Sequence, residues 1–107
     1  MGCNMGQFNV AYSKSSEIQY FSHLDFLDNV SKNTVKKLIA AFEKADKTLS
    51  ENPFAYPVFY KDFRRLTVGG RYIMMYKVIE SDVYVDKILD MRTDEYNGIV
   101  NEIDDEV

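Results

Sequence analysis

The sequence has very few residues that bind metals or act as nucleophiles. Its 107 residues include one cysteine, Cys3, and one histidine, His23. A single cysteine rules out an internal disulfide and favours a reducing, cytoplasmic setting. One histidine and one remote cysteine supply neither a zinc ligand set nor a Ser-His-Asp or Cys-His arrangement. We therefore expect no metal site, and we expect His23 to lie on the surface of a helix.

Long apolar runs and phosphate-binding glycine loops are also missing. No stretch approaches the ~20 apolar residues that cross a bilayer, and the first residues lack the charged start and apolar block of a signal peptide. Gly69-Gly70 joins two predicted strands, whereas a phosphate-binding loop leads from a strand into a helix. We expect no membrane association and no cofactor.

What is present is the composition of one folded domain. Hydrophobic residues make up 46% of the chain and aromatic residues 14%, which separates it from disordered sequences. A chain of this length buries roughly two-thirds of its unfolded surface around one core. We assign residues 1–107 to a single domain, with residues 1–6 as a loose leader and residues 97–107 as an acidic tail.

The net charge of −4 is unevenly distributed. Residues 93–107 contain six acids and no base, so residues 1–92 carry 13 bases against 11 acids, a net charge of +2. The acidic end either keeps the protein soluble or covers a basic surface until a partner displaces it. From residue 94 onward we expect a short helix or a frayed segment.

All four arginines follow residue 63, and earlier basic positions are lysines. They are Arg64, Arg65, Arg71 and Arg92. Guanidinium groups are planar, permanently charged and rich in donors, which suits phosphate and carboxylate. Their segregation indicates an anion-facing surface, although ordinary solvent-facing positions on strands would give the same pattern.

The first half of the chain is predicted to contain a strand and a helix before its strongest element. Residues 7–13 alternate between apolar and polar and are predicted as a strand. Ser15 and Ser16 are N-cap candidates for the first helix. Its predicted buried stripe is Tyr20, Phe21, Leu24, Leu27 and Val30.

The strongest predicted element is a second helix. Ser31 or Asn33 caps it, and apolar residues recur at three- and four-residue steps. These residues are Val35, Leu38, Ile39, Phe42, Ala45 and Leu49. The helix is predicted to end near Asn52, because Pro53 disfavours helical geometry in the residue before it.

Three strands are predicted to follow, at about residues 59–68, 71–80 and 82–90. Gly69-Gly70 forms a tight hairpin between the first two, since glycine tolerates positive φ. The order is β-α-α-β-β-β, and two consecutive helices cannot each cross over between neighbouring parallel strands. The predicted fold class is therefore α+β, with a helix hairpin on one face of a mainly antiparallel sheet. The other face is expected to be wet or bound to a partner, and to carry the function.

A surface of arginine, lysine and tyrosine can bind RNA phosphates, stack bases and cleave RNA without a metal. In such cleavage the 2′-hydroxyl of the RNA attacks the adjacent phosphate. The protein holds the in-line geometry, stabilises the negative charge and assists proton transfer. Structural roles stay open at this point, with Tyr72 as a core aromatic and Arg64 or Arg65 paired with Asp62 or Asp90.

The chain resembles a RelE/ParE-superfamily toxin of a bacterial type II toxin–antitoxin module. The resemblance covers about residues 8–96 and includes the helix pair and the Asn52-Pro53 break. Three segments also carry it: Phe63-Arg64-Arg65-Leu66-Thr67-Val68-Gly69, Tyr72-Ile73-Met74-Met75-Tyr76-Lys77-Val78 and Ile88-Leu89-Asp90-Met91-Arg92. The superfamily fold, two helices against a mainly antiparallel sheet, agrees with the predicted order.

The resemblance implies one of two activities. RelE-like members are endoribonucleases that cut mRNA, commonly on the ribosome, whereas ParE-like members inhibit DNA gyrase without catalysis. Both are neutralised by an antitoxin that wraps the toxin with a helix or extended segment. We expect a metal-independent mRNA endoribonuclease that arrests translation and growth. The alternatives are a ParE-like gyrase inhibitor and a decayed member that only binds its antitoxin.

The resemblance also implies roles for individual residues. The predicted catalytic set is Arg71, Arg92, Lys61 and Tyr96, in which the arginines stabilise phosphate and Lys61 or Tyr96 assists proton transfer. The predicted RNA-binding set is Arg64, Arg65 and Tyr72. Neighbouring residues on a strand point to opposite faces, so only one of the first two can face the open side.

The sequence departs from the nuclease pattern at two places. Ile73 follows Tyr72, where nuclease members often have an arginine, and Asp90 stands near a position where some relatives have a histidine. Arg71 is expected to share a strand face with Ile73 and to replace part of the missing group.

Overall fold

Five strands form one sheet at the centre of the computed structural model, which describes residues 8–105. They are β1 (Asn9–Tyr12), β2 (Val58–Tyr60), β3 (Phe63–Val68), β4 (Tyr72–Ile79) and β5 (Asp82–Asp90). Their order across the sheet is β1-β5-β4-β3-β2. β1 pairs with β5 in parallel, and the other neighbours are antiparallel. The predicted leader, with Cys3, and the last two residues of the tail lie outside the described residues.

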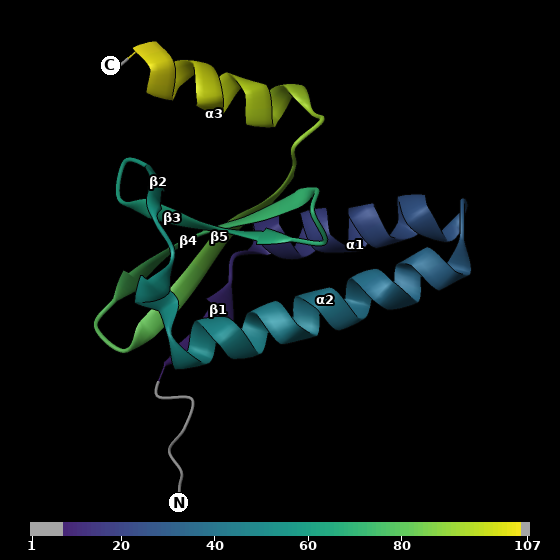
Figure 1. Ribbon diagram of the computed structural model, residues 1–107, viewed down its shortest axis with the longest axis horizontal. Coiled ribbons are helices and arrows are strands. Elements are labelled where there is room, and N and C mark those ends of the chain that lie inside the picture. Colours follow the sequence, from purple (N-terminus) through teal and green to yellow (C-terminus); the bar gives the residue numbers. More distant parts are fainter. Residues whose placement is uncertain (1–7, 106–107) are drawn as a thin grey trace, which may run out of the picture.

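Two long helices cover one face of this sheet (Figure 1). They are α1 (Lys14–Asp28) and α2 (Lys32–Glu51), and a short 3₁₀ helix, η1 (Pro53–Ala55), follows them. A third helix, α3 (Asp94–Asp105), lies on the opposite side of the sheet. The predicted α+β class, with a helix hairpin on a mainly antiparallel sheet, is confirmed. Among these helices none combines the length and apolar character needed to cross a membrane.

The start of α1 differs from the prediction. Ser13, not Ser15 or Ser16, is the N-cap, and its hydroxyl accepts the backbone N–H of Ser16 at 2.9 Å. The same hydroxyl donates to the carbonyl of Asp86 at 2.6 Å, which ties the helix start to β5. Ser16 is fully buried and its hydroxyl donates to the Ser13 carbonyl. These contacts fix the direction in which α1 leaves the sheet.

The packed side of α1 is narrower than predicted. Leu27 is buried, and Tyr20 and Leu24 pack against the core. Phe21 and Val30 were placed in the buried stripe, but they are 64% and 69% exposed. α1 carries apolar residues on several sides, so periodicity alone does not identify the side that faces the sheet.

The boundaries of α2 agree with the sequence. Ser31 is its N-cap, accepting the Thr34 backbone N–H at 3.3 Å, and Asn52 is its C-cap. Its buried residues are Leu38, Phe42, Ala45 and Leu49, all members of the predicted apolar set. Pro53 then starts η1, and its carbonyl accepts the hydroxyl of the fully buried Tyr76 at 2.6 Å. This bond fixes the helix end against the centre of β4.

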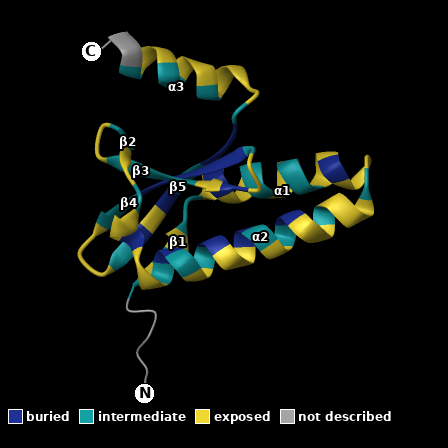
Figure 2. Ribbon diagram, in the orientation of Figure 1, coloured by how far each residue is buried: buried dark blue, intermediate teal, exposed yellow. Residues whose placement is uncertain are grey.

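The main core lies between the helix hairpin and the sheet (Figure 2). The strands contribute Val68, Tyr72, Met74, Tyr76, Val83, Val85 and Ile88. Alternation along β4 explains the contribution of this strand, because every second residue from Tyr72 points towards the helices. Residues between them, such as Ile73 and Met75, therefore point to the second face.

One predicted strand, residues 59–68, is divided into β2 and β3. Lys61 has a φ of 53° in the turn between them. Lysine rarely adopts a positive φ, so the sequence does not predict this turn. The predicted Gly69-Gly70 hairpin is confirmed, with φ values of 63° and 74°. Glu80 also has a positive φ, 55°, in the turn before β5.

The second face of the sheet is not an open, wet surface. Ile73, Met75 and Leu89 lie on it, and each is at most 2% exposed. α3 packs over this face through three side chains. Tyr96 stacks on Phe59 with ring centroids 6.3 Å apart, Glu95 pairs with Lys87 at 3.4 Å, and Glu102 accepts the Tyr60 hydroxyl at 2.7 Å. The face predicted to carry the function is therefore partly covered by the acidic end of the chain.

Candidate functional site

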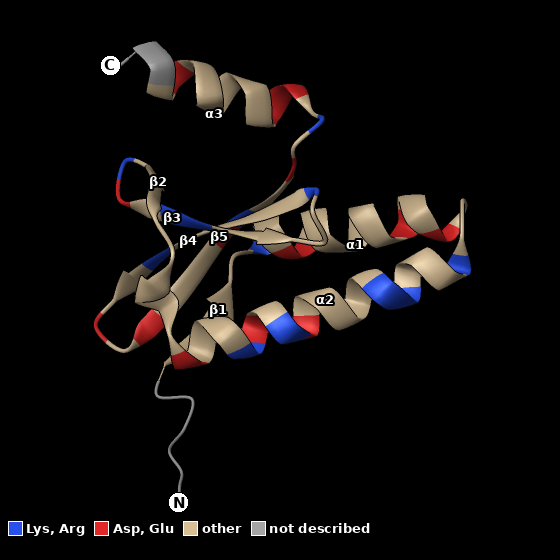
Figure 3. Ribbon diagram, in the orientation of Figure 1, with Lys and Arg blue, Asp and Glu red and all other residues tan. Residues whose placement is uncertain are grey.

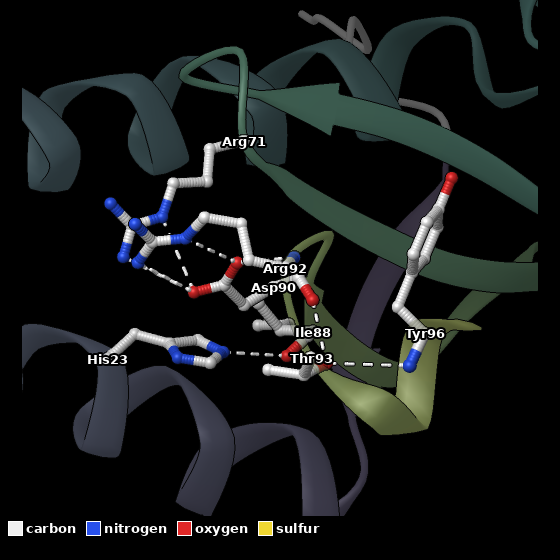
Figure 4. A network of polar contacts seen from close by, with 7 residues as sticks. All are labelled: His23, Arg71, Ile88, Asp90, Arg92, Thr93 and Tyr96. Atoms are coloured by element: carbon white, nitrogen blue, oxygen red, sulfur yellow. Dashed lines mark hydrogen bonds and ion pairs between the residues drawn. The ribbon is translucent and has the colours of Figure 1, made fainter. Parts of the chain in front are cut away.

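Two arginines share one carboxylate at the end of the sheet where the turn between β3 and β4 lies (Figure 4). Arg71 lies in the turn before β4, Asp90 is the last residue of β5, and Arg92 follows shortly after. The pairing of Tyr72 with Asp90 across β4 and β5 brings these turns together. Arg71 donates from Nε and Nη2 to Asp90 Oδ2 at 3.3 and 3.2 Å. Arg92 donates from Nε to Oδ1 and from Nη2 to Oδ2, both at 3.4 Å.

This cluster carries a net positive charge, because two guanidinium groups face one carboxylate. The Asp90 side chain is only 10% exposed, against 27% for Arg71 and 61% for Arg92. Burial alone would raise the pKa of Asp90, but hydrogen bonds from the backbone and side chain of Arg92 and the charge of Arg71 outweigh it and lower that pKa. Asp90 therefore stays ionised and fixes both guanidinium groups, whose remaining N–H groups can bind an anion.

The geometry decides one open alternative and corrects one expectation for these residues. Asp90 pairs with Arg71 and Arg92, not with Arg64 or Arg65, whose pairing with it the sequence leaves open. Arg71 was also expected to share the face of Ile73. Its guanidinium lies instead 5.1 Å from the ring centroid of Tyr72, because Arg71 belongs to the turn and follows Asp90 to the helix-facing side.

A histidine from α1 lies beside the arginine pair. His23 was expected on a helix surface, but it is half-buried, and its ring centroid is 4.8 Å from that of Tyr72. Its Nε2 lies 2.8 Å from the carbonyl oxygen of Ile88 (Figure 4). A carbonyl oxygen only accepts, so Nε2 carries the hydrogen and the neutral ring keeps a lone pair on Nδ1. Sequence reasoning missed this residue because its partner is 65 positions away.

Tyr72 belongs to the core rather than to an exposed stacking surface. It is 3% exposed and packs between His23 and Phe42, whose ring centroid is 6.1 Å away. Burial raises the pKa of Tyr72. Its ring supports His23 on one side and the guanidinium of Arg71 on another, so Tyr72 sets the spacing of these two groups.

Arg64 and Arg65 point to opposite faces, as the alternation of β3 requires. Arg64 donates to the Tyr56 carbonyl at 2.6 Å and lies over the Phe54 ring at 5.3 Å. Arg65 lies over Phe59 at 5.1 Å, on the face that α3 covers. Both guanidinium groups are therefore engaged locally, and neither joins the arginine pair.

Lys61 and Tyr96 are not gathered with Arg71 and Arg92. Lys61 precedes β3 and Arg71 follows it, so six strand residues, roughly 20 Å, separate the two ends. Tyr96 is linked to the cluster only through its backbone N–H, which donates to Thr93 at 3.4 Å, and its ring points away from the arginines (Figure 4). The structure thus unites two of the four predicted catalytic residues and adds His23 to them.

The arrangement is suited to an anion rather than a metal. Within residues 8–105, no three His, Cys, Asp or Glu side chains lie together as metal ligands. Both oxygens of Asp90 face guanidinium groups. The chemistry that this site supports is therefore binding and charge stabilisation of phosphate or carboxylate.

The role of Asp90 in stability can be tested by pH. We expect Asp90→Asn to lower the free energy of unfolding by about 1–2 kcal/mol at pH 7, since it removes charge-assisted bonds that are partly exposed. Because the folded pKa is lowered, the contribution is present above about pH 4 and is lost as the pH falls through the folded value. Urea unfolding at pH 7 and pH 3 measures it, with the exposed Asp25→Asn as the control. Equal losses at both pH values would contradict the assignment.

Comparisons with known proteins identify the fold. No family model matches the sequence, and no curated protein sequence matches it. Among solved structures, a chain from the chromosomal ParDE TA system of P. aeruginosa superposes with a TM-score of 0.66 at 11% sequence identity. The match covers 79% of this chain and 97% of that chain. This chain therefore has the fold of a protein from a ParDE toxin–antitoxin system.

Proposed function

We propose that this chain is the toxin of a type II toxin–antitoxin module and that it cleaves mRNA without a metal. The observation that carries the proposal is the arginine pair fixed by Asp90, with His23 beside it and its Nε2 2.8 Å from the Ile88 carbonyl oxygen. The fold shared with a ParDE chain supports the toxin assignment. A cognate antitoxin is then the expected protein partner.

In the proposed reaction Arg71 and Arg92 bind the non-bridging oxygens of the scissile phosphate. The 2′-oxygen forms a bond to phosphorus, and the bond from phosphorus to the 5′-oxygen breaks. The products are a 2′,3′-cyclic phosphate and a 5′-hydroxyl, whose proton comes from water. His23 accepts the proton of the 2′-hydroxyl at Nδ1, because Nε2 is committed to the Ile88 carbonyl. The two guanidinium groups stabilise the charge that develops on the phosphoryl oxygens.

One observation favours a second candidate, a ParE-like inhibitor of DNA gyrase. Lys61 and Tyr96, expected to assist catalysis, lie away from the arginine pair, and acidic α3 covers the second face. In this alternative Arg71 and Arg92 bind an acidic surface of the target protein, and no covalent bond is broken. The acidic α3 would repel RNA, so it agrees better with a protein target than with an RNA substrate.

The two candidates are separated by tightly induced expression in bacteria, with protein and DNA synthesis followed by pulse labelling. We expect early arrest of translation and new transcript ends that carry 2′,3′-cyclic phosphate. Early arrest of DNA synthesis with intact transcripts would replace the nuclease by the gyrase inhibitor. Arrest of neither would overturn both and leave a member that only binds its antitoxin.

A further inference from the structure

A second surface of the molecule has the form of a binding groove. It lies where α1 and α2 meet the sheet and has a volume of about 350 Å³, at the lower end of the range of ligand pockets. Its apolar lining includes Tyr20, Phe21 and Phe42. None of the residues of the arginine pair, nor Asp90 between them, lines it. The groove is therefore distinct from the anion site.

The apolar part of the groove continues onto the exposed side of α1. The ring of Tyr20 packs edge-on against Phe42 and Phe21, with centroids 5.1 and 5.2 Å apart. Phe21 is 64% exposed, and Ile18 on the same helix is 60% exposed. An exposed aromatic beside a groove is typical of a surface that is covered by a partner.

The charged residues that line the groove are all acidic, and Tyr12, which also lines it, donates its hydroxyl to Asp46. Glu17, Glu43 and Asp46 line it, and no lysine, arginine or histidine does. None of these three acids forms an ion pair in the described part of the chain. No lysine of α2 lines the groove, although Figure 3 shows both signs of charge along that helix. Burial and the charge of Glu43 together raise the pKa of Tyr20, which agrees with a negative potential in the groove.

We propose that this groove binds a protein segment that presents an apolar anchor flanked by lysine or arginine. The anchor would pack on the three aromatic rings, and the basic residues would pair with the acids of the rim. Nucleic acid and anionic lipid fit poorly, because the rim would repel their phosphates. The binding does not depend on catalysis at the arginine pair.

Selection from a random peptide library displayed on phage, with the full chain as target, tests the inference. We expect the enriched peptides to carry Leu, Ile, Met or Phe next to lysine or arginine. The double variant Glu17→Lys/Glu43→Lys should weaken the enriched peptides about tenfold or more. Both positions are exposed, and neither side chain has a hydrogen-bond partner among the described residues, so the variant is expected to fold.

A matched control separates the effect of charge within the groove from the effect of the net charge of the protein. Asp25→Lys/Glu51→Lys changes the net charge by the same amount at exposed positions outside the groove, and we expect it to leave peptide affinity within about twofold. Phe21→Ala should also weaken binding about fivefold or more, since it removes an exposed wall of the groove. No enrichment, peptides without a basic bias, or equal weakening by both double variants would overturn the inference.

Discussion

We expect Arg92→Ala to reduce RNA cleavage about 10²–10³-fold, the usual effect of removing one donor that stabilises a developing negative charge. The side chain is 61% exposed and contributes two of the bonds to Asp90. The fold should therefore survive, while the phosphate site loses half of its positive charge. Cleavage of ribosome-bound mRNA by purified protein measures the effect, with thermal unfolding as the check on folding.

Two further variants sharpen this result. Arg92→Lys keeps the charge but not the planar fork of donors, so an intermediate rate is expected. Lys44→Ala removes one exposed positive charge from α2, outside the site, and should leave the rate unchanged. Full activity of Arg92→Ala would remove this residue from the proposed mechanism. A different result would point to a protein target: the wild type cleaves no RNA, and Arg92→Ala nevertheless abolishes growth arrest.

The second large effect is expected at His23. His23→Gln keeps a side-chain donor for the Ile88 carbonyl but offers no basic nitrogen, so cleavage should fall about 10²-fold or more. The informative readout is the pH profile. The wild-type profile should contain the contribution of the group that accepts the proton, and the variant should lose that contribution.

A purely structural role for His23 predicts a different outcome. If His23 only joins α1 to β5, the variant should alter stability while the shape of the pH profile persists. His23→Phe keeps the ring contact with Tyr72 and lacks both nitrogens, which makes it the matched comparison. Equal pH profiles for the wild type and both variants would exclude His23 as the proton acceptor.

Much of the architecture follows from local sequence patterns. α2 is predicted closely because one apolar stripe, a serine cap and Pro53 all agree. α1 is predicted less well, because apolar residues lie on several of its sides and only the position of the sheet decides which are buried. The split between β2 and β3 depends on the positive φ of Lys61. Tertiary packing, not the conformational preference of lysine, determines this backbone conformation.

Only part of the candidate site could be predicted from the sequence. Arginine chemistry identifies Arg71 and Arg92 as anion-binding residues, but their common partner follows from the register that sets Tyr72 opposite Asp90. His23 joins them through a contact between α1 and β5, which no local pattern encodes. Tyr96 was assigned from the family resemblance, yet its ring stacks on Phe59 and points away from the arginine pair.

The parallel pairing of β1 with β5 has a consequence for the synthesis of the chain. Asn9 pairs with Asp82, 73 residues later, so the first strand has no partner in this sheet until β5 has left the ribosome. Asp90 and Arg92 emerge later still. The anion site thus cannot assemble before β5 and Arg92 have been synthesised, and a translation product that ends before Asp90 would lack it. The proposed toxicity would therefore arise only after Arg92 has left the ribosome.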